Sequence, residues 1–594
     1  MKRKITILTI AFLSSVLMCA NAFAAATGRC GDSITWTLDD SGNLTLSGSG
    51  EMWNNGYDDS PFKDYEIRKA TVKYGITSIG ESAFLGCRGM TELTLPNSVT
   101  SIGGNAFEGC SGLTELILPN SVTSIGNAAF VDCSGLTELI LPNSVTSIGG
   151  NAFEGCSGLT ELTLPNGVRS IGDSAFSGCS GLTELILSNG VRSIGDYAFS
   201  GCSGLTELIL PSSVTSIGDG AFRGCSGLTE LTLPNSVTSI GDGAFRGCTG
   251  MTELTLPNSV TSIGDCAFYG CSGLTELTLP DSVASIGDFA FSDCSGLEKI
   301  TVESGNSCYD SRDNCNSIID TETNTLIVGC KNSVIPNSVT SIEDGAFRGC
   351  SGLTELTLPN SITSIGNCAF YGCSGLTELT LPNSVRSIGD GAFSGCSGLT
   401  ELTLPNSVTR IGDCAFYGCT GLTELILPNS VSSIGDIAFT YCSGLEKITV
   451  ESGNSCYDSR DNCNSIIDTE FNTLIVGCKN SVIPNSVTSI GYYAFYGCSG
   501  LTELTLPDSV ASIGDGAFIC CSDLSKITSL AEIPPMCGSG VFDRVNKTNC
   551  ELIVPEGSVA AYKQAEVWNE FSNISGFSGV EVTVAGKTRK IVVE

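Results

Sequence analysis

A 23-residue unit repeats in one register along most of this chain. Its consensus sequence is close to C-S-G-L-T-E-L-T-L-P-N-S-V-T-S-I-G-D-x-A-F-x-G, and one cysteine marks each of its 17 copies. A period in the twenties with leucines spaced L-x-x-L-x-L is typical of a solenoid to which each turn contributes one short strand. The marker cysteines are Cys87, Cys110, Cys133, Cys156, Cys179, Cys202, Cys225, Cys248, Cys271, Cys294, Cys350, Cys373, Cys396, Cys419, Cys442, Cys498 and Cys521.

A single turn of such a solenoid cannot bury its own apolar side, so the turns have to fold as a stacked array. The predicted fold class is therefore a leucine-rich repeat solenoid, α/β or mostly β. We expect a parallel sheet on one face, short irregular or helical segments on the other, and two 33-residue hairpin insertions at 303–335 and 451–483. The insertions are almost identical and lie 148 residues apart, which indicates that a block of repeats was duplicated with its insertion.

The first residues are typical of an export signal. Lys2 opens a positively charged start, residues 5–18 are apolar, and a small-x-small sequence ends at Ala24. Cys19 raises the alternative of a lipid anchor, but the methionine before it is too large for the usual lipobox. No other run approaches the ~20 apolar residues of a membrane span. We therefore expect a secreted or cell-surface protein without a transmembrane span in its mature form.

The repeats and their interruptions divide the chain into zones. The segments on either side of residues 39–42 are predicted to form a hairpin that covers the first turn. Apolar residues at helical spacing predict a helix-like stretch at 558–571, and the last residues are predicted to form a final hairpin. The predicted zones are a signal peptide at 1–24, an N-terminal β cap at 25–66, the solenoid at 67–523, a C-terminal cap at 524–576 and a C-terminal tail at 577–594.

Charge and composition exclude several functions. The 62 acidic and 29 basic residues give a net charge of -33, which becomes -36 once three basic residues leave with the signal. Such a polyanion disfavours nucleic acid and anionic membranes as partners and favours basic proteins. The chain has no histidine, which removes Ser-His-Asp and Cys-His catalysis and His-ligated zinc. We expect no enzymatic activity, no cofactor and no metal site.

Alternation within the repeat assigns its faces. In residues 113–118 the leucines point into the core, while Glu115 and Ile117 point outward onto the sheet face. Val122 and Ile125 form a second apolar pair. Because every unit carries the phenylalanine of the A-F dipeptide, we expect an aromatic spine along the core.

The marker cysteines form one column, ~4.8 Å apart if the turns stack like strands. Identical turns give no reason for one pairing over another, so we expect buried, reduced thiols, with a disulfide ladder as the alternative. Outside the column, three pairs could clip the insertions and the C-terminal cap in an exported protein, or remain free thiols. These candidate disulfides are Cys315 with Cys330, Cys463 with Cys478, and Cys537 with Cys550.

The phrases LPNSVTSIGDGAFRGCSGLTELTL, YDSRDNCNSIID and NTLIVGC resemble the BspA-like leucine-rich repeat family of bacterial surface proteins. The resemblance covers roughly residues 67 to 530, and it is specific because unit length, the I-G-x-x-A-F-x-x-C signature and the insertion wording all match. It implies a cell-surface antigen or adhesin that binds host extracellular-matrix proteins such as fibronectin and fibrinogen. The resemblance supplies no binding site.

The first candidate binding surface is the sheet face. Fourteen units place glutamate at one outward position, and the other three carry Lys299, Lys447 and Lys526. Neighbouring carboxylates ~5 Å apart repel by ~0.8 kcal/mol even in water. The column is therefore a relic of recent copying, an anionic stripe for a basic partner, or a row of weak calcium sites. Its members are Glu92, Glu115, Glu138, Glu161, Glu184, Glu207, Glu230, Glu253, Glu276, Glu355, Glu378, Glu401, Glu424 and Glu503.

The second candidate surface is a variable edge just before the marker cysteine. Arginine and tyrosine, which are enriched in interface anchors, recur there, although drift on a solvated edge would give the same pattern. The residues of this edge are Arg223, Arg246, Tyr269, Arg348, Tyr371, Tyr417 and Tyr496.

These features predict a non-enzymatic, exported protein-binding module, an adhesin for host matrix or other cell-surface proteins. An extended array of repeated contacts gains avidity from multivalency. The alternative is a structural spacer or surface-layer component without a specific ligand. We expect the sheet face rather than the edge to be the contact.

Overall fold

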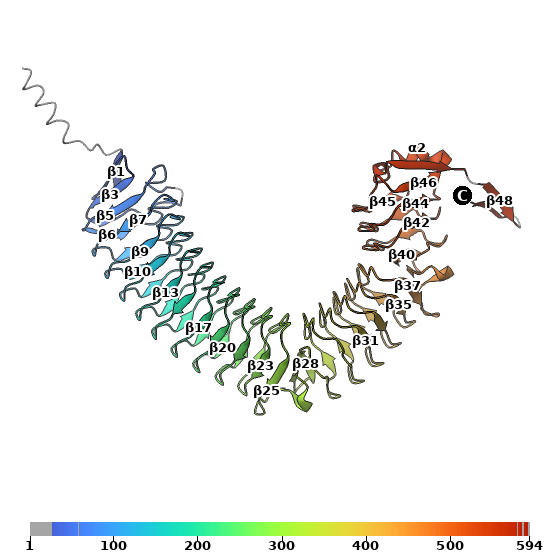
Figure 1. Cartoon of the computed structure of the whole chain (residues 1–594), viewed down its shortest axis with the longest axis horizontal. Helices are drawn as coiled ribbons and strands as arrows, with labels where there is room; N and C mark the ends of the chain where they lie inside the picture. The colour runs from blue at the N-terminus through green and yellow to red at the C-terminus, as the bar shows by residue number, and fades with distance from the viewer. Residues whose placement is uncertain (1–25, 58, 579, 585–586, 592–594) are drawn as a thin grey trace, which may run out of the picture. The chain divides into compact units, whose positions relative to one another are not determined.

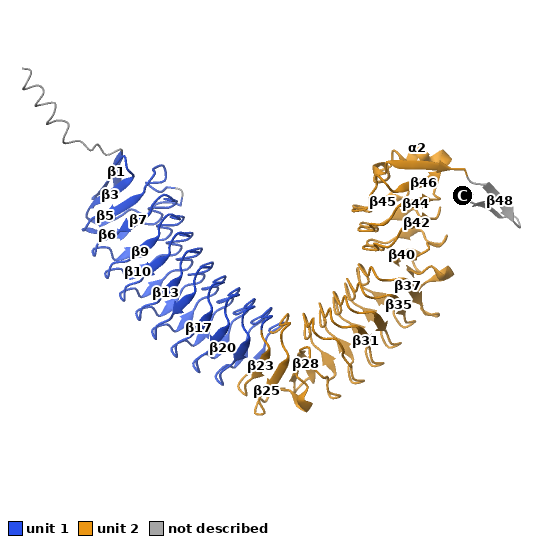
Figure 2. Cartoon of the chain, in the orientation of Figure 1, with its two compact units in different colours: residues 1–273, 285–290 blue, residues 274–284, 291–594 orange. Residues whose placement is uncertain are grey.

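The computed structural model describes residues 26–57, 59–578, 580–584 and 587–591. The predicted export signal and Cys19 lie outside the described residues. The chain divides into two compact units (Figure 2). The first comprises residues up to 273 together with 285–290, and the second comprises 274–284 with 291–594.

Each regular turn contributes two short strands, as β9 (Glu115–Ile117) and β10 (Ser124–Ile125) illustrate (Figure 1). The S-I strands pair in parallel with their equivalents one turn on, so Ser124 lies opposite Ser147. Many of the other strands pair in the same way, and Glu115 lies opposite Glu138. The predicted parallel solenoid is confirmed. The second ladder was not predicted, because a two-residue S-I strand is too short to show a period of two. The A-F segments, expected to be helical or irregular, are turns.

The S-I strands form the longest sheet of the first unit, with eleven strands in parallel. Their regular spacing follows from the constant turn length. These strands are β4 (Gly50–Glu51), β6 (Ile76–Ile79), β8 (Ser101–Ile102), β10, β12 (Ser147–Ile148), β14 (Ser170–Ile171), β16 (Ser193–Ile194), β18 (Ser216–Ile217), β20 (Ser239–Ile240), β22 (Ser262–Ile263) and β24 (Ser285–Ile286).

The strands that carry the glutamate column, called the Glu strands, pair two at a time through most of the first unit. Separate two-stranded ladders join β9 to β11, β13 to β15 and β17 to β19. The Glu strands of this unit are β7 (Glu92–Thr94), β9, β11 (Glu138–Ile140), β13 (Glu161–Thr163), β15 (Glu184–Ile186), β17 (Glu207–Ile209), β19 (Glu230–Thr232) and β21 (Glu253–Thr255).

The second unit repeats this plan around the two insertions. The hairpins predicted within the insertions are present: β27 pairs antiparallel with β28, and β39 with β40. Strands β28 and β40 then start new S-I sheets by pairing in parallel with β29 and β41. The first insertion sheet contains β26 (Tyr309–Asp310), β27 (Ile318–Asp320), β28 (Thr325–Val328), β29 (Ser341–Ile342), β30 (Ser364–Ile365), β32 (Ser387–Ile388), β34 (Arg410–Ile411) and β36 (Ser433–Ile434). The second contains β38 (Tyr457–Asp458), β39 (Ile466–Asp468), β40 (Thr473–Val476), β41 (Ser489–Ile490), β43 (Ser512–Ile513) and β45 (Met536–Cys537).

On the other side of the second unit lie the remaining Glu strands and the strands that continue them. Short 3-10 helices η1 (Arg312–Asn314) and η2 (Arg460–Asn462) belong to the insertions. The strands are β23 (Glu276–Leu279), β25 (Lys299–Val302), β31 (Glu378–Thr380), β33 (Glu401–Thr403), β35 (Glu424–Leu427), β37 (Lys447–Val450), β42 (Glu503–Leu506), β44 (Lys526–Ser529), β46 (Glu551–Pro555) and β47 (Asn573–Phe577).

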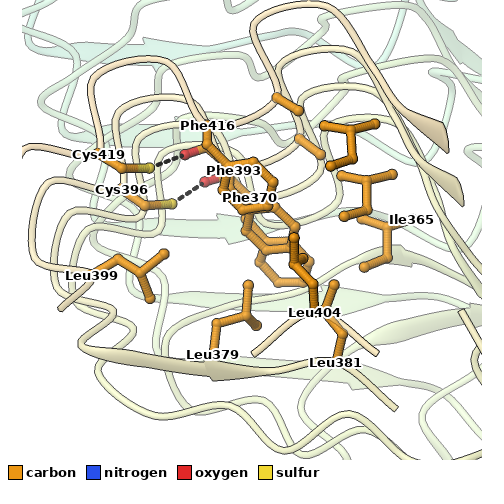
Figure 3. Close-up of a cluster of buried hydrophobic side chains, with 14 of the residues drawn as sticks. Ile365, Phe370, Leu379, Leu381, Phe393, Cys396, Leu399, Leu404, Phe416 and Cys419 are labelled. Atoms are coloured by element: carbon orange, nitrogen blue, oxygen red, sulfur yellow. Dashed lines mark hydrogen bonds between the residues drawn. The ribbon is translucent and has the colours of Figure 1, made fainter. Parts of the chain in front are cut away.

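The core is a set of parallel columns, one for each apolar position of the repeat. The phenylalanine rings stack with their centres 5.0–5.5 Å apart from Phe84 to Phe268, and again from Phe347 to Phe439. Part of this spine is drawn in Figure 3. Burying one such side chain contributes about 2–3 kcal/mol, so each turn gains from both of its neighbours.

The marker cysteines line the core beside the phenylalanine spine as buried, free thiols. The thiol of Cys419 donates to the carbonyl oxygen of Phe393 at 3.3 Å, and that of Cys396 to Phe370 at 3.2 Å (Figure 3). The same Phe393 oxygen also accepts the backbone N–H of Cys396. The thiol is therefore a hydrogen-bonding group between turns as well as a packing group.

The six cysteines of the three candidate clips are also free thiols in the structure, which is the alternative that the sequence left open. Their hydrogen bonds account for this, because each sulfur is directed at a backbone carbonyl. The thiol of Cys315 donates to Ser317 O at 3.6 Å, and that of Cys330 to Asn316 O at 3.4 Å. The equivalent pair, Cys463 and Cys478, repeats this arrangement. Cys537 and Cys550 donate to Pro535 O and Glu551 O.

The N-terminal end is covered by a small antiparallel sheet of three strands. Strands β2 and β3 form the hairpin expected around residues 39–42, and β3 continues in parallel to β5, so the cap merges with the first turn. The strands of this end are β1 (Ala26–Gly31), β2 (Ile34–Leu38), β3 (Asn43–Gly48) and β5 (Lys69–Val72).

The C-terminal end contains less helix than the predicted stretch at 558–571. Only η3 (Glu556–Ser558), α2 (Val559–Tyr562) and η4 (Trp568–Glu570) are helical. Val567 has a φ of 68°, which a continuing right-handed helix does not allow, and the buried Trp568 donates to Pro535 O at 2.9 Å. Beyond it, β48 (Val580–Val584) and β49 (Lys587–Ile591) pair antiparallel. Among the described residues, no helix has the length and apolar character needed to cross a membrane.

Candidate protein-binding surfaces

The glutamate column is exposed along the whole described length of the Glu strands. Leucines alternate with it and point into the core, as at Leu116, while Ile117 and Ile209 lie outside with 53% and 57% of their surface exposed. The sheet face thus offers carboxylates and apolar side chains side by side. All fourteen predicted glutamates occupy this exposed position.

Lysines form ion pairs with the column only where a run of glutamates begins or ends, among the described residues. In the first unit Lys69 forms an ion pair with Glu92. In the second unit Lys299 lies 3.1 Å from Glu276, Lys447 2.6 Å from Glu424, and Lys526 3.9 Å from Glu503. Between these ends, no ion pair within the described chain reaches the glutamates from Glu115 to Glu253. Their charge is available to a partner.

Grooves open on the sheet face where neighbouring Glu strands do not pair. One of about 580 Å³ lies between β11 and β13, with Glu138 and Glu161 among its lining residues. Another of about 550 Å³ lies between β15 and β17, beside Glu184 and Glu207. The second unit has a groove of about 450 Å³ that includes Glu355. Each groove brings carboxylates, threonine hydroxyls and apolar side chains together.

A second acidic column, not singled out from the sequence, follows the S-I strands. The carboxylate of Asp196 accepts the backbone N–H of Asp219 at 2.8 Å, and Asp219 in turn accepts that of Asp242. Asn127 fills the same role toward Gly150 at 3.0 Å. This column therefore closes the corner of the turn, and a neutral amide can replace its carboxylate.

The variable edge contains stacked pairs of arginine and tyrosine. In the first unit the guanidinium carbon of Arg246 lies 4.7 Å from the ring centre of Tyr269. In the second unit that of Arg348 lies 4.0 Å from the ring of Tyr371. These are cation–π contacts between successive turns. Arg223 also lies on this edge and is exposed.

Two predicted edge residues, Tyr417 and Tyr496, belong to a larger tyrosine cluster in the second unit. Tyr441 joins them, with ring centres 6.0 Å from Tyr417 and 5.6 Å from Tyr496, and Tyr493 lies 5.7 Å from Tyr496. Burial of its hydroxyl raises the pKa of Tyr417 to about 12. The sequence analysis missed Tyr441 and Tyr493, although T-Y-C in place of x-G-C was a visible departure from the repeat.

A cavity of about 480 Å³ lies beside this cluster. Tyr417, Tyr493 and Tyr496 supply its aromatic wall, while Asp543 and Arg544 come from the C-terminal cap. It differs from the sheet-face grooves in its aromatic lining. Within the described part of the chain, no three Cys, Asp or Glu side chains gather in a way that could hold a metal ion.

These features define a leucine-rich repeat solenoid with long exposed faces. The family model of the BspA type leucine rich repeat region matches the chain in six copies. The matched residues are 57–180, 146–252, 238–329, 326–446, 387–476 and 464–549. The chain belongs to this family, as its sequence resemblance implied.

Two solved structures are similar to the chain in sequence. A leucine-rich repeat protein from Bacteroides ovatus is 31% identical, with 68% of this chain and 98% of that protein covered and a TM-score of 0.45. A leucine rich cell surface protein from Faecalibacterium prausnitzii is 25% identical, with 73% and 97% covered and a TM-score of 0.44. No curated protein matches the chain.

Proposed function

We propose that the chain is a secreted or cell-surface module that binds proteins, an adhesin toward host matrix or other cell-surface proteins. The observation that carries this is the sheet face, which repeats an exposed carboxylate and an exposed Thr or Ile on successive turns. Repeated contacts gain affinity through multivalency. The acidic column selects basic patches and makes association salt-dependent. The likeness to a protein described as a cell surface protein supports this location.

The same face argues against catalysis. Acid/base chemistry needs two titratable groups in contrasting environments. The glutamates of the sheet face instead share one exposed environment from turn to turn. We therefore propose a binding role without enzymatic activity.

The test is binding of the full secreted chain to fibronectin and fibrinogen by surface plasmon resonance at about 0.05–0.5 M NaCl. The test variant carries Glu138, Glu161, Glu184 and Glu207→Gln, which removes the charges lining two grooves. We expect its Kd to rise about tenfold or more, and the salt dependence of binding to flatten.

A matched control removes the same number of charges from the other column. Asp173, Asp196, Asp219 and Asp242→Asn keeps the amide oxygen that the corner needs, as Asn127 shows. This variant should bind like the parent chain. Equal losses in both variants would mean that net charge alone attracts the partner. Loss only on Tyr371, Tyr417 and Tyr496→Ser would move the contact to the edge. If no extracellular protein binds, the chain is a spacer.

A further inference from the structure

The two insertion junctions are near copies of one another that differ in the pair of side chains facing each other across the insertion. The turn before each insertion carries a side chain where most other turns have glycine before the marker cysteine: Asp293 at the first junction and Tyr441 at the second. The turn after the insertion carries Arg348 at the first and Tyr496 at the second. Equivalent residues of the two junctions lie 148 residues apart in the sequence. The same backbone hydrogen bond is present at both: Asp293 N–H donates to Arg348 O, and Tyr441 N–H donates to Tyr496 O.

The first junction holds a guanidinium group. Arg348 Nε lies 3.1 Å from Asp293 Oδ2, and its guanidinium carbon lies 4.0 Å from the ring centre of Tyr371. A carboxylate and an aromatic face together make a site for this cation. At the first junction the chain's own Arg348 therefore occupies this cation site.

The second junction has aromatic walls but no stacked guanidinium group. No lysine or arginine in the described chain stacks on the rings of Tyr441 or Tyr496. The cavity of about 480 Å³ lies there, and Asp543 brings a carboxylate to it. Asp543 forms no ion pair with any described residue. The aromatic rings and the carboxylate that hold Arg348 at the first junction thus have counterparts around the cavity at the second.

Tyr441 adopts a backbone conformation that is unfavourable for a residue with a side chain. Its φ is 62°, in the left-handed region where the equivalent Gly418 and Gly497 have 71° and 75°. That conformation costs an L-residue roughly 1–2 kcal/mol. The ring lies against Gly497, where a Cβ would overlap it, and it remains 40% exposed. Neither burial nor backbone preference explains a tyrosine here.

We propose that the tyrosine pocket, lined by Tyr417, Tyr493, Tyr496 and Asp543, binds an arginine side chain of the protein partner, as the first junction holds Arg348. The ring of Tyr441 packs against those of Tyr417 and Tyr496 and holds them in place. The inference rests on the proposed protein-binding function and adds an anchor point to it. The guanidinium stacks on the tyrosine rings, and its N–H groups donate to the Asp543 carboxylate. The net charge of -33 attracts such a partner. Arg544, an exposed residue at the pocket, carries the opposing charge.

The test uses the full chain and the peptide acetyl-Gly-Arg-Gly-amide, with its isosteric citrulline counterpart as the uncharged control. Cys520 lines the pocket, so peptide binding should slow its alkylation by iodoacetamide, read by mass spectrometry. Cys266, a partly exposed thiol elsewhere, is the internal reference. We expect the arginine peptide to slow Cys520 at least threefold, and the citrulline peptide to leave it unchanged. Protection by both peptides or by neither overturns the proposal.

Three variants separate the chemistry. Tyr441→Gly restores the residue that the repeat uses there, and Asp543→Asn removes the carboxylate; each should weaken arginine binding about tenfold. Arg544→Gln should strengthen it about threefold, because a like charge leaves. Weaker binding on Arg544→Gln would mean that Arg544 does not repel the bound group, and would overturn the proposal. Tyr197→Ser, at an exposed tyrosine of the first unit, should change nothing.

The outcomes for pocket and function are separable. If the peptide fails to protect Cys520 while the chain still binds a matrix protein through the sheet face, only the pocket assignment fails. If the peptide binds but no extracellular protein does, the pocket stands and the adhesin proposal fails.

Discussion

At the scale of single residues, the marker cysteine shows what a repeat pattern can and cannot reveal. Its invariance within the chain predicts a buried, uniform slot, and the structure places it there. The bond from its thiol to the phenylalanine carbonyl of the preceding turn could not be predicted, because it depends on how neighbouring backbones stack. Burial also raises the pKa of Cys225 to about 12, which suppresses the reactive thiolate.

Thiol labelling checks this assignment. In the native chain at pH 8, iodoacetamide should modify partly exposed thiols such as Cys266, Cys368 and Cys414 and leave the marker column unmodified. Unfolding in denaturant without reductant should then expose the whole column to the reagent. Marker cysteines that stay unlabelled after unfolding would show that the column is oxidised, contrary to the structure. Peptide mapping by mass spectrometry distinguishes the sites.

Tyr441 and Gly497 form a second residue-scale pair, which a double-mutant cycle can measure. Gly497→Ala should cost about 3 kcal/mol, because its φ of 75° disfavours a side chain and the new Cβ meets the Tyr441 ring. In a Tyr441→Gly background the overlap is gone, and the cost should fall to about 1–2 kcal/mol. Denaturant melts of the four chains give the coupling. Equal costs in both backgrounds would mean that the ring does not press on Gly497.

At the scale of elements, the ladder of S-I strands and the ladder of Glu strands differ in how continuously their strands pair. The S-I strands run through the first unit as one sheet, whereas the Glu strands pair two at a time and leave grooves. Neighbouring glutamates of paired strands, such as Glu138 and Glu115, lie directly opposite each other. Like charges in that position destabilise a sheet. The alternation of the repeat predicted this face, but not its interruptions, since identical turns carry no sequence signal for where pairing stops.

Removing part of the column should therefore stabilise the chain. The variant with Glu138, Glu161, Glu184 and Glu207→Gln should gain about 1–2 kcal/mol at low salt, and the gain should shrink near 1 M NaCl as screening removes the repulsion. Lys299→Gln is the converse control: it should lose up to about 1 kcal/mol, because the exposed Lys299 neutralises Glu276. Chemical denaturation at both salt concentrations measures these changes. A gain that is the same at high salt would exclude a charge effect.

At the scale of the whole molecule, the fold class was the most predictable property. Unit length, leucine spacing and phenylalanine column required stacked parallel turns, and the insertion hairpins followed from apolar runs across a short turn. The missed features of the tyrosine cluster arise between segments distant in sequence. Tyr441 approaches Tyr496 across an inserted hairpin, and Asp543 and Arg544 reach the same cavity from the C-terminal cap. No periodicity within a 23-residue unit could indicate those meetings.

Buried thiols also couple the stability of the whole array to pH. Burial raises the pKa of Cys133, Cys179 and Cys225 to about 12, above the value of an exposed thiol. Between the unfolded and folded pKa values the unfolded chain binds fewer protons, so stability is complete below about pH 9 and falls as the pH rises toward 12. Each such thiol lowers the free energy of unfolding by ~1.4 kcal/mol per pH unit in that window. We expect the guanidinium midpoint, followed by circular dichroism in reductant, to stay level up to about pH 9 and to fall steeply from there to about pH 10.5. Replacing these three cysteines with alanine should make that fall shallower, which separates thiols from tyrosines and lysines that titrate nearby. An identical fall in the variant would show that thiol ionisation does not drive alkaline unfolding.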